Sequence, residues 1–243
     1  MARFHVRLGP GDPETERALA EANRTVFEQH LITGELQPPD TSIRQKLRLM
    51  VTGPSVSVPG RHDPARDAQA ELFAGVLFYG AGFRVDSAEP DLVLSRAGER
   101  FGVAVKRVTS SKNFDKRLRQ ARNQLLSAGK RGFIVVSADQ YLSEVYFRDR
   151  SANLSAVHYA RISEWTDRLP LDPARNPVLA VSGISTSFRH RSGGSGQDLE
   201  FQIHFHNRFV TWQEPAAIAG AQRFGESMAQ TLRDALLRLN ATP

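Results

Sequence analysis

The chain has 243 residues, 40% of them hydrophobic and 24% charged, which is typical of a globular protein. This length exceeds that of most single domains, but one elaborated α/β domain could still account for it. No apolar run approaches the roughly 20 residues that a membrane-spanning helix needs, and the N-terminus lacks the apolar core of a secretory signal. The lack of cysteine excludes disulfides and thiolate metal sites, and we expect a cytoplasmic protein.

Residues 1–60 are predicted to form a helical N-terminal region. Helices are expected over 13–31, with Pro13 at a plausible first helical position, and over 42–50. The segment 53–64 is rich in Gly, Pro and Ser and marks a boundary. The region contains no chemical motif, so a role in recognition or dimerisation is only a hypothesis.

A different pattern begins after this boundary, and residues 61–140 are predicted to form an α/β core. The apolar spacing and the glycines predict, in chain order, a helix over 65–82, strands over 83–85, 91–95 and 101–108, a helix over 114–127 and a strand over 132–137. The last strand is continuously apolar, which indicates an interior strand covered on both faces.

Residues 141–243 are predicted to add helices and a long hairpin to this core. A helical region is expected from 138 to about 169, followed by strands over 178–188 and 199–210 that a Gly-rich tip connects. A helix over 215–239 ends the chain. Arg189 and Arg191 stand next to the hairpin tip, which could enter a nucleic-acid groove.

Positive charge is concentrated in residues 101–131. This segment has nine basic residues and one acid, Asp115, so it carries +8, whereas the whole chain carries +6 and the remainder therefore −2. Such a segment suits a phosphate backbone, because each neutralised phosphate releases counterions. A solvated helix face is the simpler alternative. From this concentration of charge, we favour the interpretation that residues 101–131 contact nucleic acid or another polyanion.

Three positions in the core combine into a candidate site. Asp91 follows Pro90 at the start of a strand, and Lys106 lies on the next strand, on the same face as Ala104, because side chains alternate along a strand. A hairpin of this length brings the start of one strand near the later half of its neighbour. A carboxylate and an ammonium can then face the same phosphate, with Glu71 on the preceding helix.

This arrangement resembles the PD-(D/E)XK nuclease superfamily over residues 65–137, and the flanking regions carry no such resemblance. Pro90 and Asp91 match the Pro-Asp of that family, and residues 104–106 match its acid-X-Lys tripeptide except at Ala104. The resemblance implies a restriction-endonuclease-like fold, a mixed central sheet flanked by helices.

The resemblance also implies roles for these residues. Asp91 and the residue at 104 would be the principal ligands of Mg²⁺, or of Mn²⁺, and Glu71 would complete the metal site. Lys106 would orient or help deprotonate the attacking water, or stabilise the charge on the phosphate. Gln120 on the basic helix would support the site, the alternative being an ordinary surface glutamine.

Ala104 is the main departure from the family pattern, because alanine cannot ligate a metal. Three explanations stay open. The residue is an engineered replacement of Glu or Asp, which we favour; or the acid has moved to Glu71, Asp86 or Glu89; or the protein is a naturally degenerate nuclease that only binds.

We therefore expect a metal-dependent endodeoxyribonuclease of restriction or defence type that acts on double-stranded DNA as a homodimer, with this chain inactive because of Ala104. The alternatives are an inactive nucleic-acid-binding protein on the same fold and a nuclease toxin with an immunity partner. The residues expected to contact nucleic acid are Arg107, Lys112, Lys116, Arg117, Arg119, Arg122, Arg189 and Arg191.

Overall fold

The computed structural model describes residues 4–8, 13–35, 41–53, 63–170, 175–192, 197–210 and 230. Its strands are β1 (Phe4–Leu8), β2 (Arg84–Asp86), β3 (Leu92–Arg96), β4 (Glu99–Arg107), β5 (Gly132–Ser137), β6 (Val178–Ser192) and β7 (Gln197–Phe209). Its helices are α1 (Pro13–Glu35), α2 (Thr41–Thr52), α3 (Pro64–Gly80), α4 (Ser111–Ser127), α5 (Asp139–Arg148) and α6 (Leu154–Thr166). None of the described helices has the length and apolar character needed to cross a membrane.

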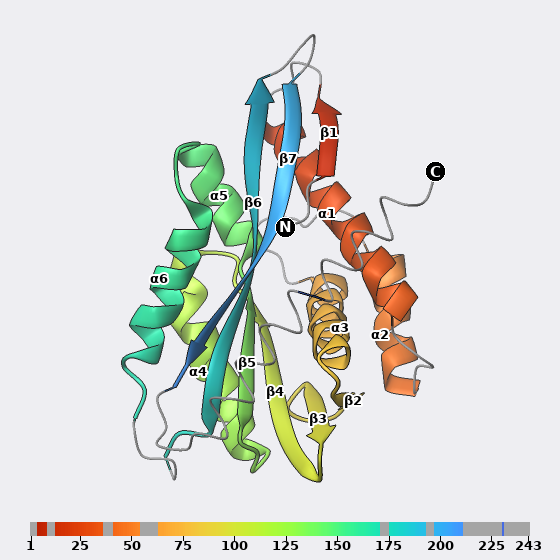
Figure 1. Ribbon diagram of the computed structural model, residues 1–243, viewed down its shortest axis with the longest axis vertical. Helices are drawn as coiled ribbons and strands as arrows, with labels where there is room; N and C mark the ends of the chain where they lie inside the picture. The colour runs from red at the N-terminus through yellow and green to blue at the C-terminus, as the bar shows by residue number, and fades with distance from the viewer. Residues whose placement is uncertain are drawn as a thin grey trace.

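These strands form one mixed sheet in the order β1-β7-β6-β5-β4-β3-β2. The pairs β4–β5 and β5–β6 are parallel, and the other neighbours are antiparallel. Helices α1, α2 and α3 lie to one side of the sheet, and α4, α5 and α6 lie to the other (Figure 1). The α/β class expected from the sequence is therefore confirmed.

The core consists of two apolar layers on either face of β4 and β5. Phe73 and Phe78 of α3 are fully buried on one side, and Phe114 and Leu118 of α4 on the other. The start of α3 is fixed by Asp63, whose carboxylate accepts a hydrogen bond from the backbone N–H of Arg66. The interior position of β5 agrees with its continuous apolar run.

The element order predicted for residues 65–137 is confirmed, whereas the N-terminal flank differs from expectation in one place. Strand β1, which the sequence analysis did not predict, pairs with β7. The helical region expected over 138–169 contains two helices, because the chain is extended at Asp149 and Asn153 begins α6 by capping it. The helix expected over 215–239 lies outside the described residues, apart from Gln230.

A buried polar network attaches α1 to the rest of the molecule. The Arg24 guanidinium lies 3.2 Å from the Asp139 carboxylate of α5. On the α3 side, Gln69 donates to the Glu28 carboxylate and accepts from Arg66. Because buried charges are stable only when they are paired or hydrogen-bonded, these contacts fix the position of α1.

Glycine is required at the start of β5, where β4 and β5 come into close contact. A Cβ added to Gly132 would lie 1.7 Å from the carbonyl oxygen of Gly102, the residue with which it pairs. The obstacle is backbone rather than a flexible side chain, so the two strands would have to move apart. By contrast, a Cβ on Gly34 of α1 would meet no atom within 4 Å.

We predict that Gly132→Ala lowers the free energy of unfolding by about 2–4 kcal/mol, since overpacking and backbone displacement are among the costliest single changes. Gly34→Ala is the matched control and should be neutral or stabilising by up to about 1 kcal/mol, because alanine favours a helix over glycine. Urea denaturation of both variants measures the difference, and equal stabilities would show that the close approach of β4 and β5 is absent.

Candidate functional site at the free edge of strand β4

The candidate site lies where β4 continues beyond its neighbour β3. The β3–β4 ladder ends at the pair Leu92 and Val103, whereas β4 stays paired with β5 as far as Arg107 and Ser137. Within the described residues, positions 104–107 therefore have a strand partner on one side only. We call this stretch the free edge of β4.

Asp91 and Lys106 meet at this edge. Asp91 Oδ2 accepts a hydrogen bond of 2.7 Å from the backbone N–H of Val105 and lies 3.0 Å from Lys106 Nζ. Lys106 Nζ also donates to the Val105 carbonyl oxygen at 2.8 Å. The two side chains thus satisfy both backbone groups of Val105 that β3 would otherwise pair, which agrees with the general rule that buried backbone groups are hydrogen-bonded.

Ala104 lies just beyond the end of the β3–β4 ladder. It follows Val103, and Asp91 precedes Leu92, so Ala104 and Asp91 each lie one residue outside the last pair of the register. Lys106 shares the face of Ala104 because side chains alternate along a strand. Ala104 is fully buried, while the Asp91 and Lys106 side chains are 12% and 14% exposed. Two of the three sequence-predicted positions, Asp91 and Lys106, therefore meet through their side chains, and Ala104 is a buried residue two positions before Lys106.

Glu71 approaches the same edge from α3 and forms a second ion pair. Its carboxylate lies 2.5 Å from Lys46 Nζ of α2, and Lys46 also donates to the Asp91 carbonyl oxygen at 3.4 Å. Burial raises the pKa of Glu71 above its ordinary value, and the nearby Asp91 carboxylate adds to this effect, while Lys46 and Lys106 oppose it. Lys46 was missed by the sequence analysis because no motif marks it; only the packing of α2 on α3 brings it here.

The glutamine that reaches the site is Gln124 rather than Gln120. Gln124 Nε2 lies 3.4 Å from Asp91 Oδ1 and 3.5 Å from the Pro90 carbonyl oxygen. Gln120 is exposed one turn earlier, and its amide oxygen accepts from Arg117 at 3.3 Å. The sequence shows that the two glutamines are spaced i, i+4 and share a face of α4. It does not show which of the two lies beside Asp91.

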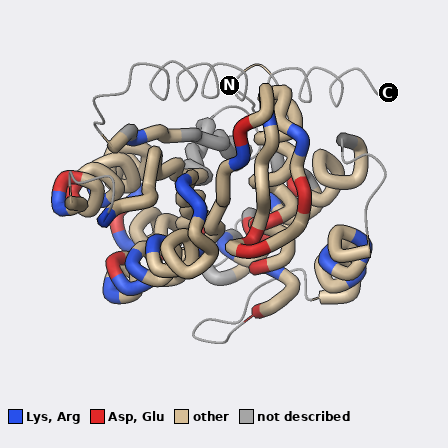
Figure 2. Tube along the Cα trace, turned by 90° about the horizontal axis from the view of Figure 1, so that it is seen from below, with Lys and Arg blue, Asp and Glu red and all other residues tan. Residues whose placement is uncertain are grey.

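The basic residues of the segment 101–131 have different surroundings. Three exposed cations of α4, at i, i+4 and i+7, share one helix face: Lys112, Lys116 and Arg119. We call them the cation row. Arg107 instead pairs with Asp67 at 3.2 Å, and Arg122 donates to the Arg175 carbonyl oxygen. Figure 2 shows basic residues on helices at both sides of the sheet. The side chains of Arg189 and Arg191 lie outside the described residues.

A small cavity of about 100 Å³ connects the free edge with the two flanking helices. It is lined by Asp67, Ala70, Glu71, Val105, Lys106, Arg107 and Arg117. Glu71 comes from α3 and Arg117 from α4, so side chains from both faces of the sheet meet around the free edge. The cavity could hold a small anionic group such as a phosphate oxygen against Lys106 and Arg117.

The donor set does not fit the Mg²⁺ site that the family resemblance implies. Mg²⁺ is held by oxygen ligands, in most sites one or two carboxylates that are available to the metal. Here Asp91 and Glu71 are each paired with a lysine, and Ala104 supplies no oxygen. Among the described residues no group of three acidic or histidine side chains is arranged to hold a metal ion. The two ammonium groups instead neutralise the two carboxylates.

Comparisons of the chain with protein-family models, with curated proteins and with solved structures found no match. The geometry of the free edge and of α4 therefore carries the functional assignment. That geometry joins two acids, two lysines and an amide around one largely buried strand end.

The raised pKa of Glu71 predicts a pH dependence of stability. A carboxyl whose pKa is higher in the folded protein binds protons more tightly there, so its contribution is greatest below the ordinary value of 4.5 and is lost as the pH rises through the folded pKa. The free energy of unfolding of Glu71→Gln relative to the unsubstituted protein should therefore increase as the pH is raised above 4.5. Urea denaturation over a pH series measures this difference.

Lys46→Met serves as the control for this prediction. It removes the cation that lowers the pKa of Glu71, so the loss of stability in this variant should grow as the pH rises. A Glu71→Gln difference that stays constant with pH would contradict the assignment.

Proposed function

We propose that the protein binds nucleic acid across α4 and the free edge of β4, on a restriction-endonuclease-like core in which Ala104 occupies the position of a catalytic acid. The observation that carries this proposal is the contact of Lys106 with Asp91 at 3.0 Å, just beyond the last pair of the β3–β4 ladder and beside Ala104. The cation row lies on the exposed face of α4, the helix that follows β4.

The cation row supplies the contact with the phosphate backbone. Its three members are exposed, and they span about 10 Å along the helix at a rise of 1.5 Å per residue. Contacts of this kind position a nucleic acid without reading its sequence. Arg117 lies on the same helix and lines the cavity next to Lys106, so a backbone that follows the row reaches the free edge. Double-stranded DNA bound by a homodimer with a defence role remains our proposed setting.

In its present form the site favours binding over hydrolysis. Phosphodiester hydrolysis needs a base for the attacking water and neutralisation of the phosphate charge. Lys106 carries the charge for the second, although here it is paired with Asp91. Asp91 is poorly suited to the first, because its two oxygens already accept hydrogen bonds from Val105, Lys106 and Gln124. We therefore propose that cleavage requires an acid at position 104.

Ala104→Glu tests this proposal through stability as well as activity. A carboxylate at this fully buried position should cost about 3 kcal/mol and lower the Tm by about 5–10 °C. Mg²⁺ or Mn²⁺ should restore much of the loss, because a ligand that binds only the folded state stabilises it. Thermal unfolding with and without the metal measures both effects.

The control is Ala104→Gln. Glutamine has nearly the same volume as glutamate but no charge, so the Tm of this variant should not respond to the metal. In the same buffers Ala104→Glu should cleave plasmid DNA, and the further change Lys106→Ala should abolish cleavage. If Ala104→Glu is neither stabilised by metal nor active, position 104 does not belong to a metal-dependent nuclease site.

Loss of the cation row should weaken nucleic-acid binding in a salt-dependent way. We expect Lys116→Ala and Arg119→Ala each to reduce the slope of log affinity against log salt by about 1, because each removes one phosphate contact. Fluorescence anisotropy with labelled duplex DNA at several salt concentrations measures the slope. Arg148→Ala is the control: it removes one positive charge from an exposed position of α5 and should leave the slope unchanged. If all three variants change the slope equally, the contact with nucleic acid is not localised to the cation row.

A further inference from the structure

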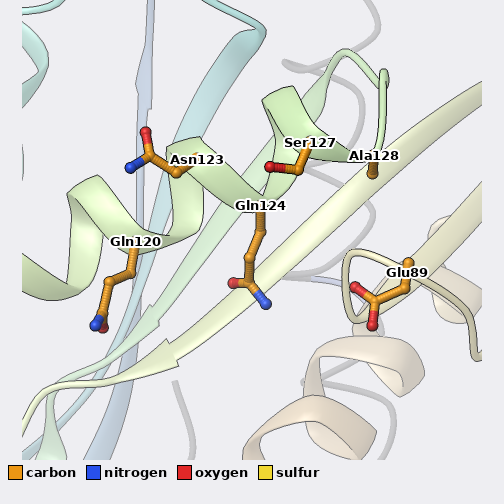
Figure 3. A pocket seen from close by; sticks show the side chains of 6 residues that line it. All are labelled: Glu89, Gln120, Asn123, Gln124, Ser127 and Ala128. Carbon is orange, nitrogen blue, oxygen red and sulfur yellow. The ribbon is translucent and has the colours of Figure 1, made fainter.

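A groove of about 530 Å³ lies beside the candidate site, on the α4 side of the sheet. It is lined by Glu89, Gln120, Asn123, Gln124, Ser127 and Ala128, and we call it the amide groove. Figure 3 shows Glu89, on the turn before β3, across the space from the side chain of Gln124 on α4. The volume lies within the range of about 300–1,000 Å³ that is usual for small-molecule pockets.

The groove is lined mainly by uncharged polar side chains, and these adjoin the cation row. Residues 120, 123, 124 and 127 are spaced i, i+3, i+4 and i+7, so they share one face of α4. At 3.6 residues per turn, the centre of this face lies roughly 60° around the helix from the centre of the cation row. A strand whose phosphates follow the cations would therefore present its bases to the amides.

The hydrogen-bonding groups of the groove include acceptors as well as donors. Gln124 Oε1 is buried and has no hydrogen-bond partner among the described residues, whereas its Nε2 is directed to Pro90 and Asp91. Glu89 adds an exposed carboxylate, which can only accept. Because a buried acceptor without a partner is costly, the groove suits a ligand that brings N–H donors.

We propose that the amide groove binds an unpaired nucleobase that carries an exocyclic amino group, with adenine as the preferred base. Asn and Gln side chains form paired hydrogen bonds with the N6 amino group and N7 of adenine, and the groove offers the amides of Gln120, Asn123 and Gln124 together with the carboxylate acceptor of Glu89. Thymine and uracil have a carbonyl oxygen at the corresponding position, which would face these acceptors. This inference rests on the proposed nucleic-acid binding.

The position of the groove relates base recognition to the candidate site. Gln124 lines the groove and also contacts Asp91 at 3.4 Å, and Asp91 in turn holds Lys106. Gln124 therefore belongs both to the groove and to the contacts of Asp91. The groove lies between α4 and the turn before β3, so the base must be single-stranded or turned out of a duplex.

The test compares labelled oligodeoxyadenylate and oligodeoxythymidylate of equal length by fluorescence anisotropy. The unsubstituted protein should bind the adenine oligomer about fivefold or more tightly, which corresponds to one good pair of hydrogen bonds. The double variant Gln120→Ala/Asn123→Ala, at two exposed positions, should reduce this ratio to about one and leave thymine binding unchanged. Gln45→Ala, an exposed amide on α2, is the matched control and should preserve the ratio.

The outcomes separate this inference from the proposed function. Equal binding of both oligomers, or a preference that survives the double variant, overturns the adenine groove and leaves nucleic-acid binding intact. Binding of neither oligomer, nor of duplex DNA, overturns both. Oligoriboadenylate and oligouridylate in the same assay distinguish RNA from DNA as the source of the base, since an adenine preference in either supports the inference.

Discussion

The early end of the β3–β4 ladder is the constraint on which the candidate site depends. Beyond Val103, strand β4 continues along β5 alone, so the outward N–H and C=O of Val105 lack a strand partner on the β3 side. Asp91 and Lys106 take that place. An acid and a lysine are thus held at a strand end by the need to satisfy backbone polar groups, and Lys46, Glu71 and Gln124 gather around them.

The sequence predicted the parts of this site that follow from spacing within one hairpin. Asp91 and Lys106 were found because strand periodicity and the 91–106 step bring them together. Lys46 and Gln124 depend instead on how α2 and α4 pack, which no local pattern specifies. Strand β1 was missed for the same reason, because its partner β7 is far along the chain. The division of residues 138–169 depends on local capping by Asn153, a signal that was present but weak.

The candidate site is electrically balanced with alanine at position 104. Asp91 and Glu71 are each paired with a lysine, and the buried methyl group of Ala104 packs in the core. A third carboxylate would disturb that balance unless a cation joined it. With alanine at position 104, the paired acids and lysines form an electrically balanced cap of the strand end.

The place of β5 in the middle of the sheet has a consequence for fragments of this protein. The core region predicted from the sequence, residues 61–140, ends just after β5, whose other neighbour is β6 from later in the chain. A fragment limited to that region would expose the backbone of a strand that is apolar on both faces. Such an edge is a template for intermolecular pairing, so a fragment without β6 should self-associate through the uncovered edge of β5.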